Sequence, residues 1–194
     1  LRLVKFTSGE VLIDGRNIAD IGSKEFLSFR KKMQIIFQDP YASLNPRLTI
    51  EQTLTEPMEV HKIESNQSDR TNLAVSLLEE VGLESAHLKR YPHEFSGGQR
   101  QRICVARALT TQPEFIVCDE CVSAMDVSVQ AQVLNLLQEL KESRNLTYLF
   151  ISHDLCVVRH ISDDIVVMRS GRIEEHGNAE EICQQPKSSL LYTS

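Results

Sequence analysis

The apolar residues of the chain follow two spacings, which together predict strands that alternate with helices. Short apolar runs of strand length occur at Val11–Ile13, Met33–Phe37, Phe115–Cys118 and Leu146–Ile151. Apolar residues recur at helical spacing in residues 49–90, in the segment after Ser96 and in Val127–Lys141. The last two strands have the pattern of runs buried on both faces of a sheet. Such alternation is typical of an α/β fold with a mainly parallel sheet.

The carboxyl-terminal part of the chain continues this alternation with shorter elements. We expect a helix over residues 154–161, a strand at Ile165–Met168 and a last helix over residues 178–184. A Ser170-Gly171 turn follows that strand and leads into residues 172–174, so the sequence predicts a hairpin there.

The composition fits one globular domain and excludes several classes of protein. The 194 residues are 41% hydrophobic and 25% charged, which is enough to build a core. A net charge of -6 has the wrong sign for a broad nucleic-acid-binding face. No apolar run approaches the length of a bilayer span. Cys118 and Cys121 have CxxC spacing, but zinc would need a second pair of ligands, and none stands at useful spacing.

Polar residues follow three of the predicted strands, where a parallel sheet gathers its ligands. Gln38 follows the second strand, Asp119 and Glu120 follow the third, and His153 follows the fourth. The carboxylate of Asp119 suits Mg²⁺, which is usually held by one or two carboxylates together with phosphates and water. Glu120, one residue further, would face another direction and polarise an attacking water molecule. These acids thus predict two different roles.

The Ser96-Gly97-Gly98 segment predicts an anion site at the start of a helix. Serine is a good N-cap, and residues without side chains let backbone N–H groups approach a phosphate closely. The helix dipole favours a negative charge at the same end.

Five segments carry these residues in one order along the chain. They are Ile35-Ile36-Phe37-Gln38-Asp39-Pro40, Phe95-Ser96-Gly97-Gly98-Gln99-Arg100-Gln101-Arg102, Phe115-Ile116-Val117-Cys118-Asp119-Glu120, Ser123-Ala124-Met125-Asp126 and Ser152-His153-Asp154. This order closely resembles the Q-loop, signature sequence, Walker B, D-loop and H-loop of the ATP-binding cassette (ABC) family. The wording around Gln38, Tyr91–Gln99 and Val127–Leu137 resembles the oligopeptide, dipeptide and nickel importer ATPases of that family.

The resemblance implies a P-loop NTPase-like fold, ATP and Mg²⁺ as cofactors, and a role for each matching residue. It implies Glu120 and His153 as catalytic residues, and Asp119 and Gln38 as Mg²⁺ ligands. The residues implied in nucleotide binding are Gln38, Ser96, Gly97, Gly98, Gln99, Asp119 and Asp126. In the family, the signature residues grip the γ-phosphate of ATP bound to the opposite subunit, and Asp126 would bridge the two subunits.

The resemblance also implies partners and a location. The chain would power uptake of peptides or a related small solute, such as nickel, from the cytoplasmic side of the cell membrane. Its partners would be transmembrane permease subunits, a second ATPase subunit that is identical or a paralogue, and indirectly a solute-binding protein. Nucleic acid is not expected as a partner.

One motif of the family is missing from the sequence. No G-x-x-x-x-G-K-[ST] pattern occurs, and Thr7–Gly15 resembles the stretch that follows the P-loop helix. We therefore expect Leu1–Lys5 to end that helix, the P-loop strand to be missing from an amino-terminally truncated cassette, and the chain to be inactive alone. Within one partial ABC ATPase domain (1–194), residues 41–110 would form the helical subdomain with the signature motif, and residues 111–194 the Walker B, D-loop and H-loop part of the core.

Two other functions stay open. A degenerate cassette that acts as a scaffold or regulator would explain the missing P-loop, whereas Glu120 and His153 argue against it. A soluble cassette ATPase of DNA repair or translation would carry long coiled-coil inserts or paired cassettes, but the insert here is short and the chain is acidic.

Overall fold

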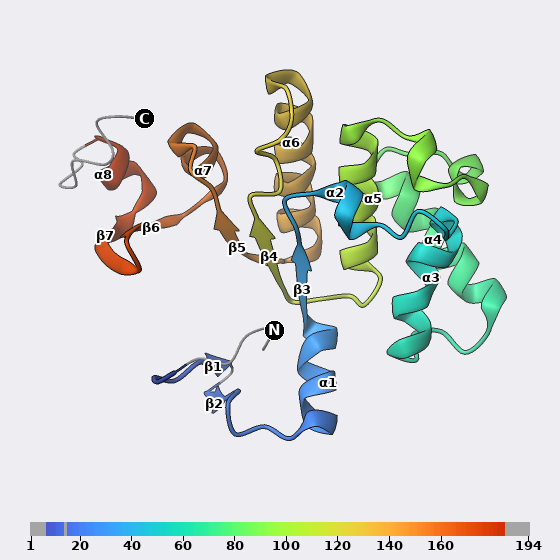
Figure 1. Cartoon of the computed structure of the whole chain (residues 1–194), viewed down its shortest axis with the longest axis horizontal. Helices are drawn as coiled ribbons and strands as arrows, with labels where there is room; N and C mark the ends of the chain where they lie inside the picture. The colour runs from blue at the N-terminus through green and yellow to red at the C-terminus, as the bar shows by residue number, and fades with distance from the viewer. Residues whose placement is uncertain (1–6, 14, 185–194) are drawn as a thin grey trace.

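A three-stranded parallel sheet lies at the centre of the computed structural model, which describes residues 7–13 and 15–184 (Figure 1). Its strands stand in the order β3 (Met33–Ile36), β4 (Phe115–Asp119) and β5 (Thr147–Ile151). The prediction of an α/β fold with a parallel sheet is confirmed. Because the three strands are parallel, their carboxyl ends lie at one edge of the sheet.

Helices α2 to α5 gather on one side of this sheet. They are α2 (Pro40–Ser43), α3 (Ile50–Val60), α4 (Gln67–Glu80) and α5 (Gly97–Leu109), with two 3-10 turns, η1 (Ser85–Lys89) and η2 (Pro92–Glu94). Helix α6 (Val127–Arg144) connects β4 to β5, and Tyr148 of β5 donates a hydrogen bond to the Leu137 carbonyl of α6 at 3.0 Å. A single apolar cluster joins these helices to the sheet through residues such as Leu54, Leu78, Ile103, Ile116 and Leu137.

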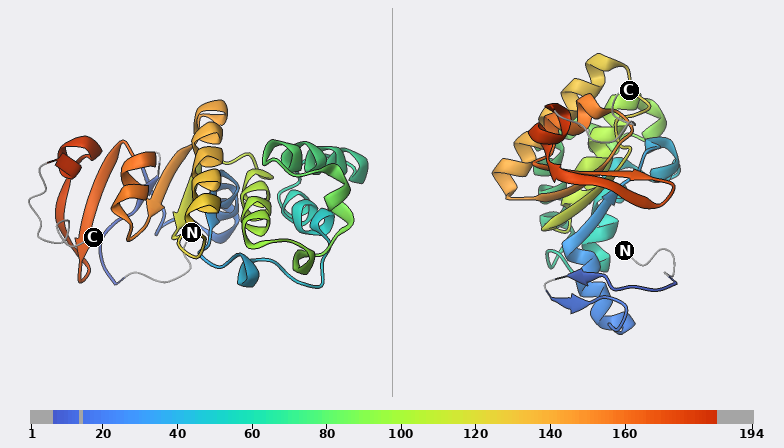
Figure 2. Two further views of the ribbon diagram at one scale, coloured as in Figure 1. Left: turned by 90° about the horizontal axis from the view of Figure 1, so that it is seen from above. Right: turned by 90° about the vertical axis from the view of Figure 1, so that its left-hand side faces the viewer.

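Two antiparallel strand pairs lie apart from the central sheet, each with its own apolar cluster. Strands β1 (Leu12–Ile13) and β2 (Arg16–Asn17) lie with α1 (Ser23–Lys32), and β6 (Asp164–Arg169) and β7 (Arg172–Asn178) lie with α7 (Leu155–Ile161) and α8 (Ala179–Gln184). Figure 2 shows β6, β7 and α8 at one end of the molecule and α3 to α5 at the other. The β6–β7 hairpin confirms the predicted turn, because Ser170 and Gly171 both have positive φ (49° and 75°).

Some expectations from the pattern were wrong in detail. Strand β4 is not buried on both faces: Ile116 and Cys118 are fully buried, whereas Phe115 and Val117 are half-buried. Strand β5 is also not a buried run, because Leu149 and Ile151 are exposed. Among the described strands β5 pairs only with β4, so one edge and one face of it stay uncovered.

Helix α1 was not predicted, although Phe26, Phe29 and Met33 recur at helical spacing and are buried together.

No helix in residues 7–13 and 15–184 is long and apolar enough to cross a membrane. The expected end of the P-loop helix, Leu1–Lys5, lies outside the described residues.

Candidate functional site

Three side chains that were predicted to act together meet at the carboxyl edge of the sheet. Gln38, Glu120 and His153 each follow one of the three parallel strands. The Gln38 amide donates a hydrogen bond from Nε2 to Oε2 of Glu120 at 2.8 Å, and Nδ1 of His153 lies 3.4 Å from Oε1 of Glu120. The Glu120 carboxylate therefore lies between an amide and an imidazole.

The backbone of Glu120 is held by a hydrogen bond to the neighbouring strand and has an unusual conformation. Its N–H donates to the Ile151 carbonyl at 3.0 Å, which ties the turn after β4 to the end of β5. Its φ of 48° lies in the left-handed region, where residues other than glycine are uncommon. A backbone held in this way sets the direction of the side chain, which is 31% exposed.

Ser123 is a member of this group that sequence reasoning missed. Its hydroxyl donates to the Glu120 carbonyl at 2.9 Å and accepts a hydrogen bond from the Gln38 amide at 3.3 Å. The available signal was a hydroxyl residue three positions after Glu120, within the turn that the acid begins. Ser123 thus holds both Glu120 and Gln38.

Asp119 is the last residue of β4, directly beside Ile151 of β5, and its side chain is half-buried. Within residues 7–13 and 15–184 no three His, Cys, Asp or Glu side chains come together as a metal site. One carboxylate and the amide oxygen of Gln38 at the same edge instead fit the mode in which Mg²⁺ is held partly by phosphates and water. The donor set is therefore compatible with Mg²⁺ that arrives with a nucleotide.

The start of α5 is stabilised by a capping box in which both hydrogen bonds are present. The Gln99 N–H donates to the Ser96 hydroxyl at 3.3 Å, and the Ser96 N–H donates to Oε1 of Gln99 at 3.0 Å. The Gln99 side chain, which was expected at a phosphate, therefore caps its own helix here. Gly97 and Gly98 form the first turn, where backbone N–H groups lack partners within a helix.

Asp126 caps α6 in the same manner. Its carboxylate accepts hydrogen bonds from the Val129 N–H at 3.0 Å and from the Ser128 hydroxyl at 3.1 Å. These two hydrogen bonds, the first being the larger cause, lower the pKa of Asp126 below its usual value. The side chain is exposed and charged at the surface. Ser96 to Gln99 and Asp126 thus form a second group, at the starts of α5 and α6.

Two arginines of α5 bind the short helix α2, which follows Gln38. The Arg100 guanidinium lies over the Tyr41 ring, 3.6 Å from its centroid, and donates from Nε to the Pro92 carbonyl at 2.7 Å. Arg107 donates to the Ser43 carbonyl. Arg100 is only 5% exposed, whereas Tyr41 is 66% exposed. The helix that begins at the signature residues is therefore attached to the segment after Gln38.

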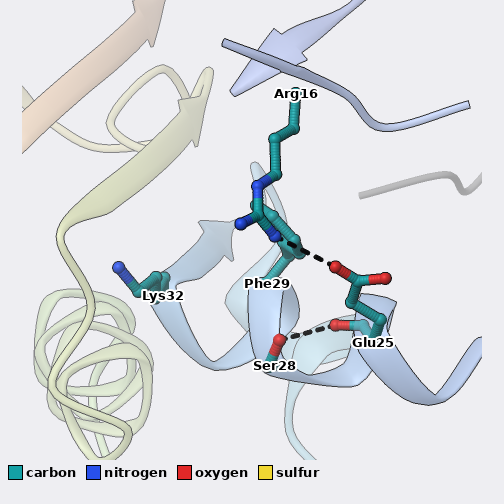
Figure 3. A pocket seen from close by; sticks show the side chains of 5 residues that line it. All are labelled: Arg16, Glu25, Ser28, Phe29 and Lys32. Carbon is teal, nitrogen blue, oxygen red and sulfur yellow. Dashed lines mark hydrogen bonds and ion pairs between the residues drawn. The ribbon is translucent and has the colours of Figure 1, made fainter. Parts of the chain in front are cut away.

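A hollow between β2 and α1 lies away from this edge (Figure 3). Arg16 pairs there with Glu25 at 3.1 Å, and the Ser28 hydroxyl donates to the Glu25 carbonyl at 2.6 Å. Lys32, which also lines the hollow, pairs with Glu114 at 2.8 Å. The charges of this hollow are thus engaged within the chain, and none of the predicted site residues lines it.

Comparison with known proteins gives one family and several close relatives. Residues 1–123 match the family model described as ABC transporter. The chain is 52% identical over 187 residues to the oligopeptide transport ATP-binding protein OppF of Bacillus subtilis (strain 168), which covers 96% of the chain and 61% of that protein. It is 50% identical over 186 residues to OppF of Streptococcus mutans, with 96% and 60% covered. The chain thus spans about 60% of the length of these curated relatives.

A solved structure has the same arrangement. The ATP-binding cassette MJ0796, a dimer in a post-hydrolysis state with ADP and Pi, superposes with a TM-score of 0.77 at 28% identity, covering 89% of this chain and 74% of that one. The fold of that cassette therefore extends over most of the described chain.

Proposed function

This chain belongs to the ABC transporter family, and on that premise we propose that it is part of an ATPase subunit that powers the uptake of peptides or a related small solute, such as nickel. The observation that carries the proposal is the contact of Gln38 and His153 with the two oxygens of Glu120. The likeness to two oligopeptide transport ATP-binding proteins supports the class of solute.

Glu120 would act as the general base. Oε2 of Glu120 accepts a hydrogen bond from the Gln38 amide, whereas Oε1 lies on the side of His153. Oε1 would therefore take the proton of the attacking water. His153 would orient that water and contact the γ-phosphate. A positioned base of this kind typically contributes about 10²–10⁴-fold to the rate.

Asp119 and Gln38 would hold Mg²⁺, which supplies neutralisation of phosphate charge when it is bound. This chain's own part is to place one carboxylate and one amide at the edge of the sheet. Phosphoryl transfer needs mainly positioning and charge neutralisation, and the polar groups at the strand ends are suited to both.

The starts of α5 and α6 would complete a site on a second ATPase subunit. Ser96, Gly97, Gly98 and Gln99 would grip the γ-phosphate of ATP held by that subunit, and Asp126 would bridge the two subunits. The dimeric state of the similar cassette supports a paired arrangement. Because the N–H groups of Ser96 and Gln99 serve the capping box, those of Gly97 and Gly98 are the expected phosphate contacts.

Residues 41–110 would form a helical subdomain that docks on a transmembrane permease at the cytoplasmic side of the membrane. Tyr41 is exposed directly after the segment that contains Gln38, and Arg100 attaches it to the helix of the signature residues. A solute-binding protein would take part only through the permease. Crosslinks from residues 41–47 to a permease loop test this docking, and crosslinks to other cytosolic proteins alone would contradict it.

The alternative function is a scaffold or regulator without turnover. No G-x-x-x-x-G-K-[ST] pattern occurs among these 194 residues. We therefore expect them alone to show neither tight ATP binding nor hydrolysis.

The test uses the full-length protein in its transporter and the variant Glu120→Gln. The amide keeps the shape of the side chain and loses its basicity, so ATP binding should persist while hydrolysis falls by about 10²–10⁴-fold. Glu174→Gln, at an exposed position on β7, is the control and should hydrolyse ATP normally. Near-normal turnover of Glu120→Gln would remove Glu120 from the role of base. A wild-type transporter that binds ATP without any turnover would favour the scaffold.

A further inference from the structure

Helices α5 and α6 approach each other so closely at their starts that Gly98 has no room for a side chain. A Cβ placed on Gly98 would overlap Cγ1 of Val129, closer than real Cβ contacts come. The neighbouring Gly97 differs, because a Cβ there would meet nothing within 4 Å. The two glycines of the signature segment therefore meet different steric limits within the chain.

A second contact continues this line of approach further along both helices. Nη2 of Arg102 donates to Oε1 of Gln132 at 3.0 Å, and Nη1 of the same guanidinium donates to the Val81 carbonyl at 3.2 Å. The pairs Gly98–Val129 and Arg102–Gln132 thus fix α5 against α6 at two successive positions. The approach at Gly98 is part of a continuous helix contact.

Val129 is also the residue that holds the cap of α6. Its N–H donates to the Asp126 carboxylate at 3.0 Å, while its Cγ1 fills the space beside Gly98. On the other helix, Gly98 directly precedes Gln99, whose N–H donates to Ser96. A shift at the Gly98–Val129 contact would therefore disturb two capped helix ends together.

We infer that Gly98 and Val129 are positioning residues that set the spacing between Ser96 and Asp126. The consequence for turnover rests on the proposed function, in which Ser96 would contact the nucleotide held by a second subunit and Asp126 would bridge the two subunits. The inference that Gly98 and Val129 set this spacing does not depend on the proposed function. Gly98 is accordingly required by a neighbour in the same chain as well as by the approach of a phosphate.

The side chain of Val129 cannot easily move aside. A β-branched residue in a helix has one strongly preferred χ1 rotamer, so Cγ1 does not rotate away at low cost. A methyl group on Gly98 would instead push the two helix ends apart. Removal of the γ-methyl groups would relieve this, since Cβ of Val129 lies at 3.8 Å, an ordinary contact distance.

The experiment compares Gly98→Ala, Val129→Ala and their double variant in the full-length protein, with Gly97→Ala and Gly97→Ala/Val129→Ala as the matched pair. The first readout is hydrogen exchange of the Val129 amide, which reports the cap by Asp126. The second is ATP turnover in the transporter. Gly98→Ala should exchange faster at Val129 than wild type and lose about tenfold or more in turnover.

The comparison of Gly98→Ala with the double variant Gly98→Ala/Val129→Ala decides whether the inference holds. Val129→Ala should restore amide protection and most of the turnover to Gly98→Ala, and should restore neither protection nor turnover lost by Gly97→Ala. Unchanged exchange in Gly98→Ala, or no rescue by Val129→Ala, would overturn the inference. If the wild-type transporter hydrolyses no ATP, the proposed function fails, whereas the exchange data still decide whether this contact sets the helix spacing.

Discussion

The Gln38 amide lies 2.8 Å from the Glu120 carboxylate although 82 positions separate the two residues in the sequence. They come together because β3 and β4 are parallel neighbours and each residue follows the end of its strand. The contact is a donor facing an acceptor, so it depends on the neutral amide. A second carboxylate at position 38 would face Glu120 instead.

Gln38→Glu should therefore reduce ATP turnover in the full-length transporter. Two adjacent carboxylates disfavour the charged state of both, so one pKa rises and the base becomes harder to deprotonate. We expect the pH at which turnover is half-maximal to move upward and turnover near neutral pH to fall about tenfold or more. The control is Gln34→Glu, on β3 but bonded to the Arg30 carbonyl rather than to Glu120. An unchanged pH profile for Gln38→Glu would contradict the prediction.

Arg100 should be important for stability, because it is a charged side chain that is buried with specific partners. Its guanidinium stacks on Tyr41 and donates to the Pro92 carbonyl, and both contacts use the planar fork. Lysine keeps the charge and loses the fork, so Arg100→Lys should lower the free energy of unfolding by about 1–3 kcal/mol. Urea unfolding followed by circular dichroism measures this.

Tyr41 supplies the matched pair for that measurement. Tyr41→Phe keeps the ring under the guanidinium and should stay within about 0.5 kcal/mol of wild type, whereas Tyr41→Ala should lose about 0.5–2 kcal/mol. When Arg100→Lys is also present, Tyr41→Ala should lower the free energy of unfolding by less than it does in the wild type. Additive losses would show that the two side chains do not stabilise each other.

Tyr148 predicts a loss of stability at alkaline pH. Burial raises the pKa of its hydroxyl above the usual value of about 10, because the charged phenolate is disfavoured inside the protein. The contribution of the Tyr148 hydroxyl to the free energy of unfolding is therefore complete below about pH 10, where the unfolded chain also keeps this proton. It is lost as the pH rises further.

Tyr148→Phe should be less stable by about 1 kcal/mol near neutral pH, since it loses the hydrogen bond to Leu137. Between about pH 10 and 12 its stability should fall less steeply than that of wild type, as urea midpoints would show. Parallel curves would refute the assignment.

The cysteines should differ strongly in reactivity toward iodoacetamide. Burial raises the pKa of Cys104 to about 11, and a hydrogen bond with Cys121, followed by burial, raises the pKa of Cys118. Cys156 is exposed. Since the thiolate is the reactive form, Cys156 should be alkylated first, and the buried thiols only in denaturant. Peptide mass spectrometry measures the order, and early labelling of Cys118 would contradict the buried arrangement.

The sequence was sufficient for the fold class, which follows from local patterns. It was also sufficient for the residues at the strand ends, which the order of the five segments and its family resemblance singled out. Gln38, Glu120 and His153 are each placed by the end of an apolar run, and parallel pairing then brings them together. Ser123 was not predictable in this way, since its role depends on the turn that Glu120 makes with a positive φ.

Other features of the site depend on distances between helices, which a single sequence does not contain. The close approach of Gly98 to Val129 needs the packing of α5 on α6. The stacking of Arg100 on Tyr41 joins residues that polarity alone would place at the surface. The exposure of β5 was missed because an apolar run indicates a tendency to be buried and not whether a partner covers it.

That exposure predicts self-association of the 194-residue chain by itself. Leu149 and Ile151 on β5 are 51% and 44% exposed, and Val166 and Met168 on β6 are 50% and 61% exposed. Among the described strands, β5 pairs only with β4 and β6 only with β7, so both present an unpaired edge. Unpaired edges with apolar side chains are sites of association between chains.

The double variant Leu149→Lys/Ile151→Lys should therefore shift the isolated chain toward the monomer, because charges at an edge oppose pairing with another copy. Ile173→Lys is the control, since it removes an exposed apolar side chain from β7 and leaves the edge of β5 unchanged. Light scattering after gel filtration, at concentrations that span about two orders of magnitude, measures the mass of each variant. We expect wild type and Ile173→Lys to increase in mass with concentration and the double variant to stay near 22.0 kDa. A monomeric wild type at every concentration would show that the uncovered side of β5 is not an association surface.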